Sequence, residues 1–258
     1  MLGAMKRLVI VGGTGDALQL AKRAILLQRG FANDLPGLEV ITTLAGRTRE
    51  PNSISGSVRI GGFGGEAGLI DYLQTEKIDL IIDATHPFAA QISWHVANAA
   101  TEVGMPRLML VRPAWTRSPE DNWIEVESIE AAIAAIPASA ERIFVTIGRQ
   151  QLAPFANLTD RWCLMRSIDP PDPSIPLPPG KLLLDRGPFN LEAERQLFKE
   201  YQIQAIVSKN SGGDATYAKI IAARELSLPV VMVQRPIVPD GELVADVAGA
   251  IEWLQQRL

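Results

Sequence analysis

Short apolar runs alternate along the whole chain with segments of helical periodicity. Strands are predicted in the first half at residues 6–11, 38–44, 57–62, 78–84 and 106–111, with helices at 16–29, 65–75 and 88–103. The second half predicts strands at 142–147, 161–166, 181–185, 203–208 and 229–233, and helices at 128–136, from 150–155, 189–201, 214–226 and 242–257. Near-continuous apolar strands separated by helices are typical of parallel sheets covered on both faces. We therefore expect an α/β protein of two doubly wound domains with a cleft between them.

The segment 112–128 is less regular than its neighbours and contains Pro113 and Pro119. Proline ends strands and helices because it lacks a backbone donor. We place a domain boundary here and expect an N-terminal domain over 1–113 and a C-terminal domain over 114–258.

Composition excludes several classes of protein for these 258 residues. The single Cys163 lies in an apolar run, which indicates a buried side chain and a reducing compartment. We expect a cytoplasmic protein without a membrane segment, since no signal peptide or long apolar stretch is seen. With only His86 and His95 and no cysteine pair, no metal site is expected. The basic residues are not interleaved with aromatics, so nucleic acid is not expected as a partner. The choice between a monomer and a small homo-oligomer stays open.

Six predicted strands, the one at 106–111 and the five of the second half, each end at or just before a basic residue, although the whole chain has a net charge of −4. Ligands of open parallel sheets bind beyond the carboxyl ends of the strands, so basic residues there predict a cleft for a polyanion. The alternative is that these basic residues hinder aggregation of the apolar strands that they flank. Basic residues at the amino ends of strands support this alternative. The strand-end residues are Arg112, Arg149, Arg166, Arg186, Lys209 and Arg235.

The glycine loop VGGTGDA at residues 11–17 joins the first strand to the first helix. Gly12 and Gly13 allow a phosphate to approach the backbone, and the helix N-terminus favours an anion. Thr14 can add a hydroxyl donor. Leu18 occupies the place of the third glycine of the usual dinucleotide motif, and a plain turn is the alternative.

After the second strand, Thr43, Arg47 and Arg49 stand where NAD enzymes often carry an acidic residue for the ribose hydroxyl. A guanidinium group pairs with a 2′-phosphate, which favours NADP. Solvated loop charges are the alternative. The GGFGG segment at 61–65 fits either a loop near the cofactor or a flexible turn.

Two further polar clusters follow strands. In DATHPF, at 83–88, His86 can donate a hydrogen bond or transfer a proton, whereas Asp83 and Thr85 can equally cap the next helix. In SKNSGGDATYAK, at 208–219, the predicted carboxylate-binding set is Lys209, Asn210 and Ser211. A helix cap with a glycine turn is the alternative.

In combination, VGGTGDAL, TLAGR, GGFGG, DATHPFA, TIGRQ, DRGPF, SKNSGGDATYAK and AARELSLPVVMVQRP resemble the precorrin-6A reductase family of corrin biosynthesis, which has a cobalt-precorrin-6A counterpart. The resemblance implies two Rossmann-like domains with the active site in the cleft between them. It also implies hydride transfer from a nicotinamide cofactor, usually NADPH with NADH possible, to a ring double bond of a tetrapyrrole polycarboxylate. The product would be precorrin-6B or its cobalt equivalent, and neither metal nor flavin would take part.

The resemblance and the motifs together define the expected site. The catalytic residues would be His86 and Lys209. The cofactor would contact Gly12, Gly13, Thr14, Gly15, Asp16, Thr43, Leu44, Ala45, Gly46, Arg47, Gly62 and Thr85. The substrate would contact Arg149, Arg186, Lys209, Asn210, Ser211 and Gly212. This chain departs from the family pattern at Asp16, where glutamate is frequent, and at Asp185, where glycine is expected.

Two alternatives of different kinds remain at this point. One is an NADP-dependent reductase of another small anion, and the other is a non-catalytic NADP-binding sensor. The chemistry of short-chain reductases is disfavoured, because Tyr217 and Lys219 do not have the required Tyr-x-x-x-Lys spacing.

Overall fold

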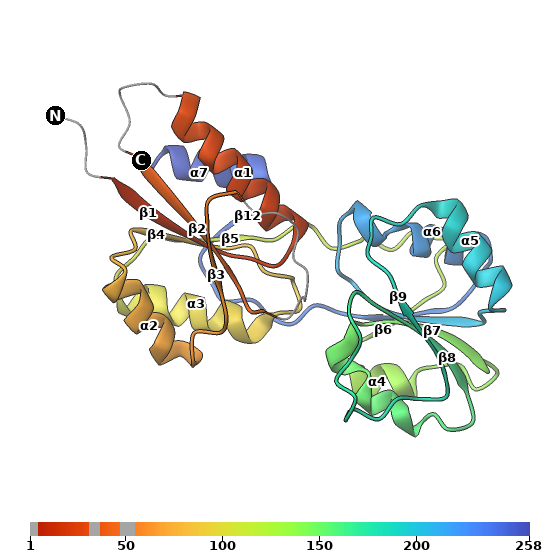
Figure 1. The fold of residues 1–258 in the computed structure, drawn as a ribbon. Helices are drawn as coiled ribbons and strands as arrows, with labels where there is room; N and C mark the ends of the chain where they lie inside the picture. The colour runs from red at the N-terminus through yellow and green to blue at the C-terminus, as the bar shows by residue number, and fades with distance from the viewer. Residues whose placement is uncertain (1–4, 31–36, 47–54) are drawn as a thin grey trace. The chain divides into compact units, whose positions relative to one another are not determined.

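The computed structural model describes residues 5–30, 37–46 and 55–258. The chain forms two compact units, one of Met1–Arg112 with Ile237–Leu258 and the other of Pro113–Pro236 (Figure 1). Each unit contains a six-stranded parallel sheet flanked by helices, which confirms the predicted α/β fold with two parallel-sheet domains. Among the described residues, no helix is long and apolar enough to cross a membrane.

The first unit has the strand order β3-β2-β1-β4-β5-β12. This is the doubly wound order 3-2-1-4-5-6, in which the direction of winding reverses between the first and fourth strands. The strands are β1 (Lys6–Val11), β2 (Leu38–Leu44), β3 (Ser57–Ile60), β4 (Leu80–Asp83), β5 (Arg107–Leu110) and β12 (Glu242–Val244), and the helices are α1 (Gly15–Gly30), α2 (Gly65–Thr75), α3 (Ala90–Glu102) and α7 (Val247–Gln255).

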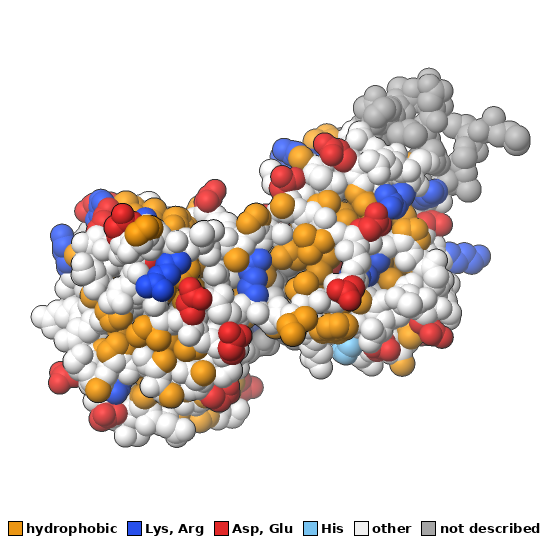
Figure 2. Space-filling view, turned by 180° about the vertical axis from the view of Figure 1, so that it is seen from behind, with side chains coloured by type: hydrophobic (Ala, Val, Ile, Leu, Met, Phe, Trp, Pro, Cys, Tyr) orange, Lys and Arg blue, Asp and Glu red, His pale blue; other side chains and the backbone are white. Residues whose placement is uncertain are grey.

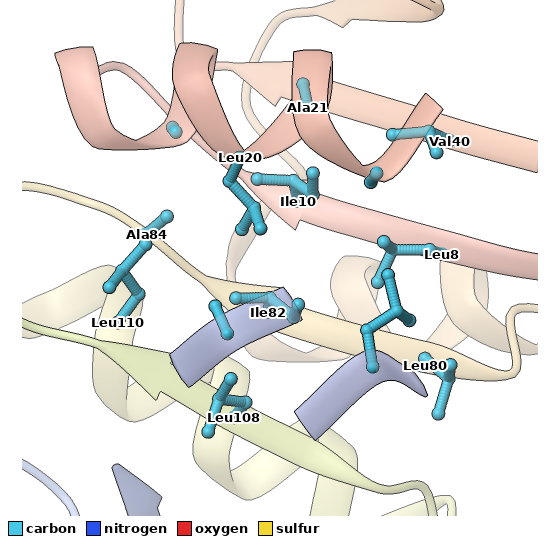
Figure 3. Close-up of a cluster of buried hydrophobic side chains, with 14 of the residues drawn as sticks. Leu8, Ile10, Leu20, Ala21, Val40, Leu80, Ile82, Ala84, Leu108 and Leu110 are labelled. Atoms are coloured by element: carbon cyan, nitrogen blue, oxygen red, sulfur yellow. The ribbon is translucent and has the colours of Figure 1, made fainter. Parts of the chain in front are cut away.

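Alternation along β1 explains why helices cover both faces of this sheet. Leu8 and Ile10 point into the layer that α1 and α7 cover, where Figure 3 shows Leu20 of α1 close to them. Val9 and Val11 point to the opposite face, into the cluster that α2 and α3 supply. In a strand that is buried on both faces, successive side chains all point into a hydrophobic core, which accounts for the continuous apolar run of β1.

The second unit repeats the order as β9-β8-β7-β10-β11-β6. Its strands are β6 (Trp123–Val126), β7 (Arg142–Thr146), β8 (Trp162–Ser167), β9 (Gly180–Leu184), β10 (Ala205–Lys209) and β11 (Val230–Val233), and its α-helices are α4 (Ile129–Ala134), α5 (Leu191–Glu200) and α6 (Ala218–Glu225). Phe144 and Ile206 pack with Phe198 of α5 and Ile220 of α6, while α4 covers the other face (Figure 1). Cys163 is fully buried, as predicted, and burial raises the pKa of its thiol to about 11.

The sixth strand of each sheet differs from the sequence expectation. The strand β6 lies in the segment expected to be irregular, yet it pairs with β11. The strand β12 lies where the last helix was expected to begin, and it pairs with β5 of the first sheet. Residues 237–258 therefore belong to the first unit, whereas the predicted boundaries assigned them to the second. The strands β6 and β12, with the sequences WIEV and ELV, lack the continuous apolar run that marked the similarly short strands β4, β5 and β11, and their partners are distant in sequence.

The helix expected from 150–155 also differs, since this segment forms two short 3₁₀ turns, Arg149–Gln151 and Ala153–Asn157. Pro154 stands in the second turn and cannot donate to a continued helix.

Trp253 of α7 fastens the C-terminal segment to the first sheet. Its side chain is buried in the cluster of Leu108 and Leu110, and its indole nitrogen donates to Glu242 over 2.8 Å. We predict that Trp253→Ala lowers the free energy of unfolding by about 3–5 kcal/mol, since a large cavity opens. Trp94→Ala, at an exposed position of α3, should change it by less than about 0.5 kcal/mol. Urea denaturation of both variants measures the difference, and equal effects would contradict the assigned role.

Candidate active site

The winding of the first sheet reverses between β1 and β4, and the glycine loop lies at that point. The Thr14 hydroxyl donates to the carbonyl of Ala84 over 2.7 Å and accepts the backbone N–H of Ala17 at 3.1 Å. Thr14 is buried, so its hydroxyl connects the ends of β1 and β4 and caps α1. The sequence predicted that this hydroxyl donates to a phosphate, but in the structure it donates to the Ala84 carbonyl.

The backbone of the glycine loop leaves room for a ligand to approach it closely. The Gly12 N–H donates to the Thr43 carbonyl over 2.9 Å, and a Cβ on Gly12 would lie 3.1 Å from Thr42. Gly13 has a φ of 114°, and nothing lies within 4 Å of where its Cβ would be. The first amides of α1, at Gly15 and Asp16, have no intrahelical acceptor, so this helix end can bind an anion.

Asp16 brings a negative charge to this helix end, and Arg112 offsets it. Their side chains form an ion pair of 2.8 Å in which both groups are partly exposed. Because the carboxylate is paired, it repels an incoming phosphate less than a lone carboxylate would. Arg112 therefore lies beside the glycine loop, and both belong to the first unit.

The ends of β2 and β3 supply the next part of the predicted cofactor site. Thr42 and Thr43 are buried, and neither hydroxyl has a hydrogen-bond partner among the described residues. Leu44, Ala45 and Gly46 follow Thr43 and are partly or fully exposed. Arg47 and Arg49 lie outside the described residues.

Arg59 of β3, which the sequence analysis did not select, shapes the GGFGG loop. Its guanidinium donates to the carbonyls of Gly61 at 2.8 Å and Gly62 at 3.1 Å. The same group lies over the rings of Phe63 and Tyr72, 4.4 and 5.1 Å from the centroids. Gly62 is therefore held at the exposed edge of the sheet by a fixed loop.

The DATHPF segment leaves β4 as a tight turn. Asp83 is buried and its Oδ1 accepts both the backbone N–H and the hydroxyl of Thr85, at 3.0 and 2.7 Å. The backbone N–H of Phe88 donates to Nδ1 of His86 over 3.2 Å. A nitrogen that accepts this bond carries no proton, so the neutral imidazole of His86 carries its proton on Nε2.

The second sheet reverses its winding between β7 and β10, and two predicted substrate residues lie there. Arg149 follows β7, is partly buried and donates to the carbonyl of Pro170 over 2.8 Å. Lys209 ends β10, and burial lowers the pKa of its ammonium group to about 8. Arg186 follows β9 and is exposed. Sheet topology thus brings Arg149 and Lys209 to adjacent strand ends.

The loop after Lys209 is hydrogen-bonded to Trp115, which lies in the segment where the chain enters the second unit. The Asn210 side chain accepts from the backbone N–H of Trp115 at 2.8 Å and donates to its carbonyl at 3.1 Å. The Trp115 indole donates to the carbonyl of Gly213 over 2.8 Å. Asn210 is buried, so its observed role is to hold the backbone rather than to face a carboxylate. Ser211, by contrast, is partly exposed.

The strand-end basic residues do not act as one set. Arg166 is buried and forms a bidentate pair with Glu194, with N–O distances of 2.5 and 3.0 Å. Its guanidinium also lies 3.6 Å from the centroid of the Phe189 ring. A buried arginine of this kind holds the core, so the prediction that it lines a polyanion cleft is wrong. In Figure 2, basic and acidic side chains are interspersed over the visible face rather than gathered by sign.

Lys219 is a further buried cation that sequence reasoning left unassigned. It lies in the first turn of α6, and its Nζ is 5.4 Å from the centroid of the Trp115 ring. Burial, reinforced by the charge of Arg166, lowers the pKa of its ammonium group to about 7. A lysine that is this costly to charge does not contribute to stability at neutral pH.

We predict that Lys219→Met raises the free energy of unfolding by about 1–4 kcal/mol at pH 6. The lysine pKa is about 7 when folded and 10.5 ordinarily, so its cost is complete below pH 7 and fades as the pH rises towards 10.5. The gain should therefore shrink over that interval in urea denaturation. Lys199→Met, at an exposed position of α5, is the control and should change the free energy of unfolding by less than about 0.5 kcal/mol.

Gly212 allows the loop after Lys209 to lie close to the backbone of Pro113. Its φ is 68°, and an added Cβ would lie 2.0 Å from the carbonyl oxygen of Pro113. Gly104, with a φ of 69° and nothing within 4 Å of its Cβ position, is a matched control. Gly104→Ala should cost about 1–2 kcal/mol of backbone strain. Gly212→Ala should cost roughly 1–3 kcal/mol more, because the Pro113 backbone must also move. Equal losses in chemical denaturation would show that the contact is unimportant.

Comparison with known proteins gives a consistent result over nearly the whole chain. The profile of the family described as Precorrin-6x reductase CbiJ/CobK matches residues 7–255. The Precorrin-6A reductase of Rhodococcus erythropolis is 46% identical over 97% of this chain and 98% of its own. That of Rhodobacter capsulatus is 40% identical over 97% and 96%. Relatives named Cobalt-precorrin-6A reductase are 25–28% identical.

A solved structure named CobK precorrin-6A reductase superposes with a TM-score of 0.88. It is 40% identical in sequence, and the match covers 98% of this chain and 97% of that one. The family match and the shared fold agree with the resemblance that the motifs indicated. This chain belongs to the Precorrin-6x reductase CbiJ/CobK family.

Proposed function

We propose that this protein reduces precorrin-6A to precorrin-6B by transferring a hydride from NADPH to one double bond of the macrocycle. The observation that carries the proposal is the family match over residues 7–255, together with a glycine loop at the winding reversal of the first sheet. The relatives named for the cobalt pigment are the more distant ones, which favours a pigment without cobalt.

The residues of the first unit fit a dinucleotide. Gly12 and Gly13 leave room beside the backbone, and the amides of Gly15 and Asp16 at the start of α1 suit a pyrophosphate. Thr14 contributes by fixing the loop. The strand β2 ends at Leu44 and the chain continues with Ala45 and Gly46, without a carboxylate for a free ribose hydroxyl, which supports NADPH rather than NADH.

When bound, the nicotinamide supplies the hydride, and the protein supplies orientation and protons. Thr85 and His86 follow β4, beside the glycine loop. The Nε2–H of His86 can donate a hydrogen bond to an oxygen of the cofactor or pigment without a change in its charge. His86 is therefore an orienting donor in this proposal.

Lys209 is the proposed proton donor. With its pKa lowered to about 8 by burial, its ammonium group is charged at neutral pH yet gives up a proton more readily than an exposed lysine. The proton would go to the carbon next to the one that accepts the hydride. Arg149, Arg186 and Ser211 would bind carboxylates of the pigment, while Asn210 and Gly212 hold the loop.

The assignment is tested by mixing the purified protein with NADPH and precorrin-6A under anaerobic conditions. NADPH oxidation in step with a change in the pigment spectrum, and formation of precorrin-6B by mass spectrometry, are expected. NADPH binding without turnover would favour a sensor, and turnover only with other small anions would favour a different reductase.

Arg47→Ala tests the preference for the 2′-phosphate. We expect the KM for NADPH to rise by about 10-fold or more, since a charge-assisted pair is lost, while the KM for NADH changes little. Steady-state kinetics with both cofactors gives the ratio. Equal effects on both cofactors would remove the claim for Arg47.

Lys209→Met should lower kcat by about 10²- to 10⁴-fold, the usual contribution of a general acid, with a smaller effect on the KM for NADPH. In the unsubstituted protein, kcat should fall as the pH rises through about 8, because the proton donor is lost. The variant should lack this dependence. Lys181→Met, at an exposed lysine at the start of β9, is the control and should keep full activity and the same pH profile.

A further inference from the structure

Arg235, which follows β11, contacts the backbone directly after Lys209. Its Nε donates to the carbonyl of Asn210 over 2.9 Å, and one terminal nitrogen donates to the carbonyl of Ser211 over 3.0 Å. The planar fork of a guanidinium holds two acceptors in a fixed relation, which an ammonium group cannot do. Arg235 is partly buried, so these bonds are shielded from competing water.

The same short loop is fixed at its other polar groups. The backbone N–H of Asn210 donates to Val233 of β11 over 2.9 Å, and that of Ser211 donates to the Lys209 carbonyl over 2.8 Å. Together with the bonds of Trp115 to Asn210 and Gly213, these contacts restrain the backbone of the loop. Lys209, the last residue of β10, directly precedes this loop.

Sequence reasoning placed Arg235 among basic residues that face a polyanion. The structure shows two of its donors directed instead at neutral carbonyls of the protein. An added Cβ on Gly212 would lie 2.5 Å from a terminal nitrogen of Arg235, so the glycine makes room for this guanidinium. Both observations indicate that the loop and the arginine are fitted to each other.

We propose that Arg235 is a positioning residue for Lys209, because its guanidinium bridges two successive carbonyls and keeps the Lys209 side chain withdrawn from water. The inference rests on the proposed function only in giving Lys209 a role in proton transfer. The bridge itself is a property of the second unit.

A loosened loop would expose Lys209. Burial is what lowers the pKa of Lys209, so exposure returns it towards its ordinary value of 10.5. The charged residues at the flanking strand ends are Arg149 after β7 and Arg235 after β11. Arg235→Lys keeps the charge and loses the fork, whereas Arg235→Gln loses both.

The experiment measures the reactivity of the Lys209 amine over a range of pH by limited acetylation and mass spectrometry of the full-length protein. Arg235→Lys, Arg235→Gln and the control Arg142→Gln are compared with the unsubstituted protein. Arg142 also donates to a backbone carbonyl, that of Tyr201, but it lies at the amino end of β7, whereas Lys209 lies at the carboxyl end of the neighbouring β10. We expect the midpoint for Lys209 to rise by about one pH unit in both Arg235 variants, as water reaches the amine, and to stay unchanged in the control.

Turnover provides the second readout. Both Arg235 variants should lower kcat about 10-fold with little change in the KM for the pigment, and should move the alkaline limb to higher pH. An unchanged Lys209 midpoint in both variants would overturn the proposal, whatever the activity. A raised KM for the pigment in Arg235→Gln alone, with normal behaviour of Arg235→Lys, would also overturn it, since Arg235 would then act through its charge.

The two proposals fail separately. If the midpoint shifts in Arg235→Lys but the unsubstituted protein does not reduce precorrin-6A, the positioning role stands and the proposed function is wrong. Arg235→Lys alone suffices if Arg235→Gln does not fold.

Discussion

The return of the chain to the first sheet, where β12 pairs with β5, is the constraint on which the rest of the structure depends. The second sheet takes all six of its strands from one continuous stretch of the chain, in which β6 pairs with β11. The strand β12, at the end of the chain, completes the first sheet beside β5. The first sheet reaches six strands only through this return, and without it the apolar side chains of β5 would lose the cover of α7 and Trp253.

Because of this return, the chain passes twice between the units, at Arg112–Pro113 and at Pro236–Ile237. Within the second unit, both passing segments are fixed to the loop after Lys209. Trp115 is bound by Asn210, and Arg235 binds Asn210 and Ser211. A loop expected to bind substrate is thus also the anchor of the connections, and Gly212 is required there because no side chain fits against Pro113. The conformation of this part of the candidate site follows from chain connectivity as much as from ligand chemistry.

The basic residues at the strand ends illustrate how burial decides the use of a charge. A cation removed from water must find a partner within the protein, and Arg166 pairs with Glu194 while Arg112 pairs with Asp16. Arg235 uses neutral carbonyls. Burial lowers the pKa of Lys209, and a lysine of lowered pKa is suited to proton transfer. Arg186, which follows β9, is exposed.

The sequence by itself determined the features that depend on near neighbours. Apolar runs predicted ten of the strands, and the glycine loop and the polar segments after β4 and β10 marked the strand ends where parallel sheets bind ligands. The combination of short motifs also indicated the family, since each motif is read from consecutive residues. Tertiary structure alone decided the edge strands β6 and β12, the internal use of the Thr14 hydroxyl and the Asn210 amide, and the roles of Arg166 and Arg235. Each of these depends on a partner far away in the chain, as in the contacts of Thr14 with Ala84 and of Asn210 with Trp115. The local sequence shows which polar groups need a hydrogen-bond partner, but only the packed fold decides which residue becomes that partner.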